Sequence, residues 1–165
     1  MTSEGNPTML TSGSPAPELA LEDTAGQAWR LSDLRGAHSA LLYFMRSTSC
    51  PICNRHVRDL AARRDEFAAA DVRVLIVVPE GRDAGATWKA DHGIPFQVLY
   101  GSAGTPHDSV GLTRKVLGSM QQSGTVLIDP DGIIRHAHGA TLPTNSYDKK
   151  GIAAAIDAMR SRTSN

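Results

Sequence analysis

The sequence lacks the features that mark a nucleic-acid-binding or membrane protein. Lysine and arginine together number 17, as do aspartate and glutamate, so the formal net charge is zero. A balanced charge gives no electrostatic reason to expect nucleic acid or anionic lipid as a partner. No apolar run approaches the ~18 residues that a membrane-spanning helix needs, and the N-terminus has no basic start followed by an apolar stretch. We therefore expect no signal peptide, no membrane association and a cytoplasmic location.

Cysteine is also scarce, with two in 165 residues. Cys50 and Cys53 lie between a strand-like apolar segment and a segment with helical spacing. In a cytoplasmic protein, two close cysteines are more often catalytic or metal-binding than structural. A Cys-x-x-Cys spacing at a strand-to-helix junction is typical of a dithiol redox centre.

The residues between the cysteines give this motif a physical basis. Pro51 suits the first turn of a helix, where its missing N–H is not needed, so Cys50 is the predicted N-cap. The sulfur of Cys50 would then face unpaired backbone N–H groups and the positive end of the helix dipole, and both favour a thiolate. Cys53 follows one turn later, close enough to form a disulfide, so the pair can cycle between dithiol and disulfide.

The length suits a single domain. Residues 1–14 are mainly small and polar and predict a flexible leader, followed by a redox domain over residues 15–165. Expected strands cover residues 15–21, 29–31, 39–44, 72–78, 96–100, 124–129 and 133–138, and expected helices cover residues 32–36, 51–70, 84–92, 108–116 and 149–160. This order predicts an α/β protein with a thioredoxin-like fold, in which helices flank a central mixed β-sheet that an N-terminal β-hairpin extends.

Several short stretches carry a resemblance to a known family: residues 31–36, 41–44, 50–53 with 57–60, and 125–132. Over roughly residues 14–160 the sequence resembles peroxiredoxin-like proteins of the alkyl hydroperoxide reductase/thiol-specific antioxidant (AhpC/TSA) group. The resemblance implies an antioxidant oxidoreductase that reduces peroxides or disulfides without a bound cofactor. It also implies regeneration by a thioredoxin-like or other thiol reductant and leaves a homodimer open.

The sequence departs from the peroxiredoxin pattern at several positions. Peroxiredoxins carry a proline and a threonine seven and three positions before the peroxide-reacting cysteine. With Cys50 in that role, Tyr43 and Ser47 stand at those places. With Cys53 in that role, Arg46 and Cys50 stand there. Ser123 occupies the place of the distant peroxiredoxin arginine and of the thioredoxin cis-proline.

Several neighbours of the cysteines have candidate supporting roles. Arg46 could stabilise a thiolate or hold a peroxide oxygen, and it could equally be a surface charge. Thr48 and Ser49 can donate hydrogen bonds to a sulfur anion, although both are ordinary residues for a loop before a helix. His56, one turn after Cys53, could accept the proton of Cys53 when that thiol attacks.

These observations predict an enzyme in which Cys50 is the nucleophile and Cys53 resolves its adduct. One alternative is a thioredoxin-like protein disulfide oxidoreductase without peroxidase activity. A non-enzymatic alternative is a redox sensor, or a metal-binding protein that uses Cys50, Cys53 and His56. Because zinc usually takes four protein ligands in structural sites, we predict no metal site.

Overall fold

A computed structural model describes residues 11–34, 36–102, 105–110, 112, 123–140 and 147–163. The strands are β1 (Leu21–Asp23), β2 (Ala28–Trp29), β3 (Ser39–Phe44), β4 (Val72–Val77), β5 (Gln97–Gly101), β6 (Ser123–Ile128) and β7 (Ile134–Ala140). The helices are the 3-10 helix η1 (Leu31–Leu34), α1 (Pro51–Ala62), α2 (Arg64–Ala69), α3 (Arg82–His92), α4 (Pro106–Ser109) and α5 (Lys149–Thr163). Within these described ranges no helix is long and apolar enough to cross a bilayer.

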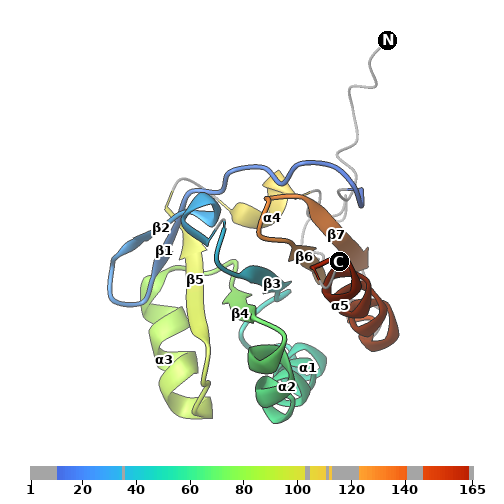
Figure 1. Ribbon diagram of the computed structural model, residues 1–165. Helices are drawn as coiled ribbons and strands as arrows, with labels where there is room; N and C mark the ends of the chain where they lie inside the picture. The colour runs from blue at the N-terminus through green and yellow to red at the C-terminus, as the bar shows by residue number, and fades with distance from the viewer. Residues whose placement is uncertain are drawn as a thin grey trace.

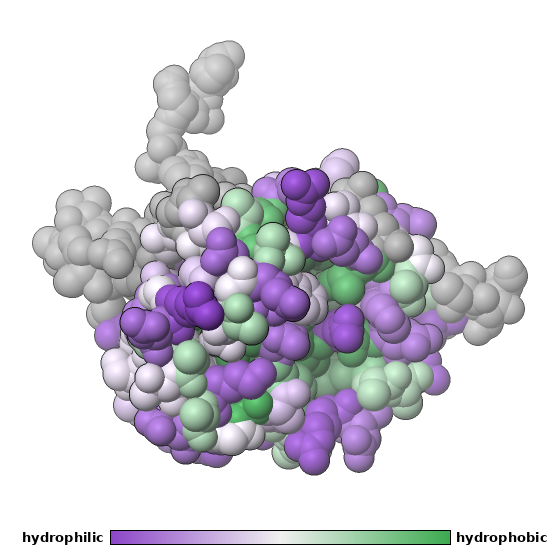
Figure 2. Space-filling view, turned by 90° about the vertical axis from the view of Figure 1, so that its left-hand side faces the viewer, coloured by the Kyte–Doolittle hydropathy of each residue, from purple (hydrophilic) through white to green (hydrophobic). Residues whose placement is uncertain are grey.

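The strands form one open mixed sheet in the order β2-β1-β5-β4-β3-β6-β7 (Figure 1). Strand β3 lies parallel to β4 and antiparallel to β6, which confirms the predicted mixed sheet. Strand β1 pairs with β2 and adds this hairpin to the sheet through β5, as the predicted N-terminal extension requires. The edge strand β2 has only two residues. The molecular surface on this side of the protein mixes polar and apolar residues (Figure 2).

Strand β3 is buried along its whole length because both faces of the sheet are covered. Its side chains alternate between two apolar clusters, so Leu41 and Tyr43 point to one face and Leu42 and Phe44 to the other. The first cluster contains both cysteines together with residues of α1, α2, α3 and α5. The second cluster is covered by η1, the segment before β1 and the residues around α4.

The cysteine motif lies where the polypeptide leaves the central strand β3 and enters α1. After β3 ends at Phe44, six residues lead to the start of α1 at Pro51. The parallel neighbour β4 ends at the same edge. The carboxyl ends of adjacent parallel strands are the usual place for a site in an open α/β sheet.

Some of the predicted elements differ from the structure. The predicted strand over residues 15–21 is wrong, because β1 begins at Leu21 and the preceding residues form a single bridge, between Pro15 and Ile133. Pro15 and Pro17 lack the N–H group that a paired strand needs. The predicted helix over residues 51–70 is divided at Arg63, whose φ of −104° and ψ of 15° end α1 and begin α2.

Two other predicted helices agree in place, with shifted ends. The helix predicted over 84–92 runs from Arg82 to His92, and the one predicted over 149–160 continues to Thr163. The prediction over 108–116 is wrong where it can be compared: α4 covers Pro106–Ser109, Val110 and Leu112 are not helical, and residues 111 and 113–116 lie outside the described residues. Most of the predicted leader also lies outside them, although Gly13 and Ser14 form backbone hydrogen bonds with Ile134. The boundary between leader and domain remains a prediction.

Gly93 ends α3 in the left-handed conformation, with φ of 59° and ψ of 43°. Since a Cβ is strained in this region, we expect Gly93→Ala to lower the free energy of unfolding by about 1–2 kcal/mol. Urea unfolding followed by circular dichroism would measure the loss. Gly93→Asn is the matched control and should lose less, because asparagine tolerates this conformation. An alanine variant as stable as the asparagine variant would contradict this account.

Candidate active site

Cys50 is the N-cap of α1, as the sequence predicts. Its backbone is extended, with φ of −72° and ψ of 114°, and Pro51 occupies the first helical position. The Cys50 sulfur accepts a hydrogen bond of 3.2 Å from the backbone N–H of Cys53. A sulfur in this position lies beside the orphan amides of the helix start, where negative charge is stabilised.

Cys53 has no exposed surface, whereas Cys50 is 6% exposed. Its sulfur receives a hydrogen bond of 3.5 Å from the backbone N–H of Arg46, and its thiol bonds to the sulfur of Cys50. Burial, followed by the bond to Cys50, raises the pKa of the Cys53 thiol to about 12. Both cysteines are free thiols. The two sulfurs are therefore in contact but chemically unequal, because Cys53 keeps its proton at neutral pH and Cys50 accepts hydrogen bonds.

Tyr43 connects Cys53 to His56. The tyrosine side chain is fully buried on β3, and its hydroxyl forms a hydrogen bond with the Cys53 sulfur that favours the thiolate. The same hydroxyl lies 2.7 Å from Nδ1 of His56 on α1. Burial, with the positive charge of Arg55, lowers the pKa of His56, while Asp59 opposes the shift. The imidazole is therefore neutral near pH 7 and can accept a hydrogen bond.

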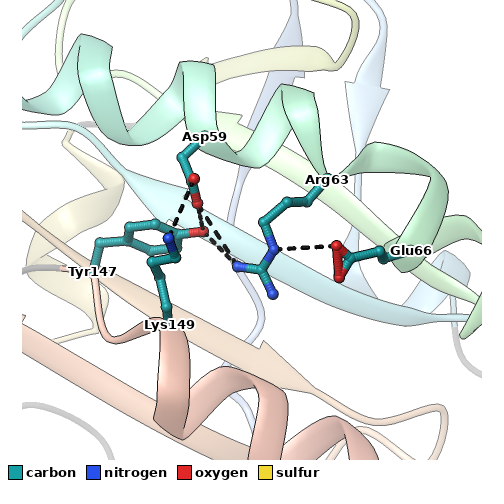
Figure 3. A network of polar contacts seen from close by, with 5 residues as sticks. All are labelled: Asp59, Arg63, Glu66, Tyr147 and Lys149. Atoms are coloured by element: carbon teal, nitrogen blue, oxygen red, sulfur yellow. Dashed lines mark hydrogen bonds and ion pairs between the residues drawn. The ribbon is translucent and has the colours of Figure 1, made fainter.

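A polar network on α1, α2 and the start of α5 supports this arrangement (Figure 3). The hydroxyl of Tyr147 donates to Asp59 at 2.6 Å and accepts from Arg63 at 3.0 Å. Lys149 lies 3.4 Å from the same carboxylate, and Arg63 also pairs with Glu66. Although burial opposes it, the bond from Tyr147 and the charges of Lys149 and Arg63 keep the pKa of Asp59 below its usual value.

This network holds the Tyr147 ring against the two residues beside the dithiol. The ring centroid of Tyr147 lies 5.1 Å from that of His56 and 6.3 Å from that of Tyr43. The Tyr43 and His56 rings meet edge-on, at 5.7 Å. The Tyr147 ring therefore packs on both side chains that form the hydrogen bond between Tyr43 and His56.

The loop before Cys50 is fixed by two residues that the sequence analysis did not select. Glu80 accepts hydrogen bonds of 3.0 Å from both the backbone N–H and the hydroxyl of Thr48. The side-chain amide of Asn54 donates to the carbonyls of Thr48 and Cys50, and its oxygen accepts from the indole of Trp88 at 2.7 Å. The contacts of Glu80 with Thr48 and of Trp88 with Asn54 join residues 32 and 34 positions apart, so local patterns did not reveal them.

The predicted supporting residues occupy different surroundings. Arg46 reaches the Cys53 sulfur through its backbone rather than its guanidinium. Ser47 and Ser49 bond to each other through their hydroxyls at 3.1 Å. Ser123 begins β6, beside the end of β3, and its buried hydroxyl has no hydrogen-bond partner among the described residues. The catalytic roles of these residues and of Thr48 remain predictions.

A hollow of about 610 Å³ lies between the start of α1 and α3, next to the loop that leads to Cys50. Thr48 and Ser49 on one side and Trp88 on the other contribute to its wall. Its lining residues are Thr48, Ser49, Asn54, Asp83, Ala84, Thr87, Trp88, Asp91 and His92. Neither cysteine is among these lining residues, although Ser49 directly precedes Cys50.

The described residues hold no group of three or more His, Cys, Asp or Glu side chains arranged for a metal ion. Of the three ligands predicted for the metal-binding alternative, His56 directs its Nδ1 to Tyr43.

A dithiol that caps the helix following the central strand of an open mixed sheet defines the class of thioredoxin-like redox proteins. The solved structure of peroxidoxin BcpB from Mycobacterium tuberculosis has this fold, with a TM-score of 0.76 at 19% identity over 92% of this chain and 97% of that chain.

The sequence model of the AhpC/TSA family matches residues 12–137, and the protein belongs to this family. Peroxiredoxin Bcp of Bacillus subtilis is 30% identical over 87 residues, which are 53% of this chain and 55% of that protein. The thiol-disulfide oxidoreductase ResA of the same species is 29% identical over 127 residues, 74% of this chain and 64% of that protein. These likenesses place the chain among peroxiredoxin-like, thiol-dependent oxidoreductases. Its relatives include both a peroxiredoxin and a thiol-disulfide oxidoreductase, so they do not decide between a peroxide and a disulfide as the substrate.

The unequal thiols lead to a test by alkylation. We expect iodoacetamide at pH 7 to label Cys50 at least roughly tenfold faster than Cys53, because the thiolate reacts and Cys53 is protonated and enclosed. Peptide mass spectrometry after timed quenching would give both rates. Labelling in guanidinium chloride is the control and should make the rates similar. Equal labelling of the native cysteines would contradict the assigned inequality.

Proposed function

We propose that the protein is a redox enzyme that reduces peroxides or disulfides through a reversible Cys50–Cys53 disulfide. The observation that supports it best is the contact between the two cysteines. Both the backbone N–H and the thiol of Cys53 bond to the sulfur of Cys50. The helix start stabilises one thiolate, and the second thiol already touches the atom it must attack.

With a peroxide, the dithiol is oxidised to the disulfide in two steps. The Cys50 thiolate attacks one oxygen, the S–O bond forms, the O–O bond breaks, and the leaving oxygen takes a proton to give an alcohol or water. Cys50 is then a sulfenic acid. Cys53 attacks the Cys50 sulfur, loses its proton and displaces the hydroxyl as water. A thioredoxin-like or other thiol reductant then returns both cysteines to thiols.

A disulfide is the second candidate substrate, and the hollow beside Ser49 favours it. At about 610 Å³ the hollow has room for a side chain or a short peptide segment, far more than a small peroxide needs. In this case Cys50 forms a mixed disulfide, and Cys53 releases the second substrate sulfur as a thiol. Tyr43 also stands where peroxiredoxins carry proline, and its hydroxyl is bonded to His56 rather than open to a peroxide.

The cellular setting belongs to the same proposal. We place the enzyme in the cytoplasm, where thiol reductants keep such dithiols reduced, and we leave a homodimer open. The metal-binding alternative receives less support than dithiol chemistry, because Nδ1 of His56 is bonded to Tyr43. A redox sensor would use the same disulfide without turnover, and turnover distinguishes the two.

Substitution of each cysteine tests the assigned roles. Cys50→Ser should abolish turnover in peroxide consumption coupled to thioredoxin and its reductase, and in reduction of insulin disulfides. Cys53→Ser should react once and stop, because the resolving thiol is missing. Mass spectrometry of the intact Cys53→Ser protein should then detect a sulfenate or a mixed disulfide.

The assay that responds identifies the substrate. Background rates in both assays, unchanged by Cys50→Ser, would rule out the proposed enzyme. An adduct trapped on Cys53 in the Cys50→Ser variant, with no adduct on Cys50 in Cys53→Ser, would reverse the two roles. Circular dichroism of each variant is the control for folding.

A further inference from the structure

The resolving step needs an acceptor for a buried proton. Cys53 has no exposed surface, so solvent does not reach its thiol directly. We propose that Tyr43 and His56 form a proton relay that takes the proton of Cys53 as it attacks the adduct on Cys50. This inference rests on the proposed function, since it assigns Cys53 the resolving role.

The hydroxyl of Tyr43 is the central atom of the relay. In the dithiol it donates to the sulfur of Cys53, whose own proton is donated to Cys50, and it lies 2.7 Å from Nδ1 of His56. In the relay both protons turn, so that the Cys53 thiol donates to the Tyr43 oxygen and the Tyr43 hydroxyl donates to Nδ1. The strand holds Tyr43 in place, because β3 is paired on both sides and its side chains are buried. The proton path therefore runs from the fully buried sulfur of Cys53, through the side chain of the fully buried Tyr43, to the half-buried imidazole of His56.

The imidazole is in the protonation state that a relay requires. Burial and Arg55 lower the pKa of His56, so at neutral pH it is uncharged and Nδ1 can accept the hydroxyl proton of Tyr43. Asp59 lies one turn along α1 and favours the imidazolium once it forms. The carboxylate stays ionised because Tyr147, Lys149 and Arg63 bond to it or lie beside it.

The groups that face His56 come from three elements. Arg55 and Asp59 are its charged neighbours on α1, Tyr43 reaches it from β3, and Tyr147 packs on it from the start of α5. Tyr147 stays protonated at neutral pH, since burial and its bond to Asp59 raise its pKa above the usual value. Any pH dependence of the relay near neutrality is therefore that of His56.

The step balances in atoms and charge. The Cys53 sulfur forms a bond to the Cys50 sulfur, and the bond from Cys50 to the substrate sulfur breaks, so the substrate leaves as a thiolate. The proton of Cys53 moves to the oxygen of Tyr43, while the original hydroxyl proton of Tyr43 moves to Nδ1 of His56. The imidazolium then loses a proton to solvent. No oxidant or reductant is consumed in this step.

A small aromatic disulfide, 5,5′-dithiobis(2-nitrobenzoate), separates the two thiol reactions. Cys50 of the reduced full chain releases one thionitrobenzoate at a rate that rises with reagent concentration. Cys53 releases the second at a rate independent of concentration. Stopped-flow absorbance resolves both phases, and the measurement needs no knowledge of the natural substrate.

Tyr43→Phe and His56→Asn should each slow the second phase by about 100-fold, the scale of a lost proton acceptor, and leave the first phase unchanged. The His56→Asn variant retains an acceptor for the Tyr43 hydroxyl but cannot take up a proton. In wild type the second phase should become faster as pH rises through the pKa of His56 and then level off. This plateau should be absent in His56→Asn.

Tyr100→Phe is the matched control, because it removes a tyrosine hydroxyl that bonds to Glu22, away from the path, and keeps the ring. Both of its phases should match wild type. Added imidazole should partly restore the second phase in His56→Ala, since His56 lies at the protein edge. A purely structural role would show no such rescue.

Unchanged second phases in Tyr43→Phe and His56→Asn would overturn the relay. A wild type that releases a single thionitrobenzoate would overturn the relay together with the resolving role of Cys53. If the variants slow the second phase while wild type turns over neither peroxide nor insulin, the relay stands and the proposed substrates are wrong.

Discussion

The hydrogen bond from the backbone N–H of Cys53 to the sulfur of Cys50 is the interaction on which the rest of the site depends. It exists because Pro51 begins a helix without needing an N–H donor, so the first free amides point to residue 50. The bond fixes the distance between the cysteines and makes them unequal. One sulfur receives hydrogen bonds at a helix end, and the other is enclosed beneath it among apolar side chains.

The central strand β3 sets the position of Tyr43, which connects Cys53 to His56. Because side chains of β3 alternate between the two faces of the sheet, Tyr43 lies on the cysteine side together with Leu41. A polar hydroxyl in this layer would be costly without partners. Its bonds to the Cys53 sulfur and to His56 satisfy it, so the residue that completes the core also connects the dithiol to a titratable group.

Local signals predicted much of the fold and the capping of α1. The buried strands β3 and β4 are apolar runs, Gly93 ends α3 as a left-handed cap, and the proline between the cysteines marks the helix start. Contacts between distant residues were not predictable in this way. Glu80 lies 32 positions from Thr48, and Trp88 lies 34 positions from Asn54. Tyr43 lies within the predicted strand over residues 39–44, but its hydroxyl partners depend on how α1 packs on β3.

Asn54 joins the indole of Trp88 to the carbonyls of Thr48 and Cys50. The hydrogen bond from the Cys53 N–H to the Cys50 sulfur belongs to the cap of α1, so we expect this cap to rearrange when the two sulfurs bond. Through the Cys50 carbonyl and Asn54, such a rearrangement would reach the surroundings of the indole. We therefore expect the fluorescence of Trp88 to report the oxidation state of the dithiol.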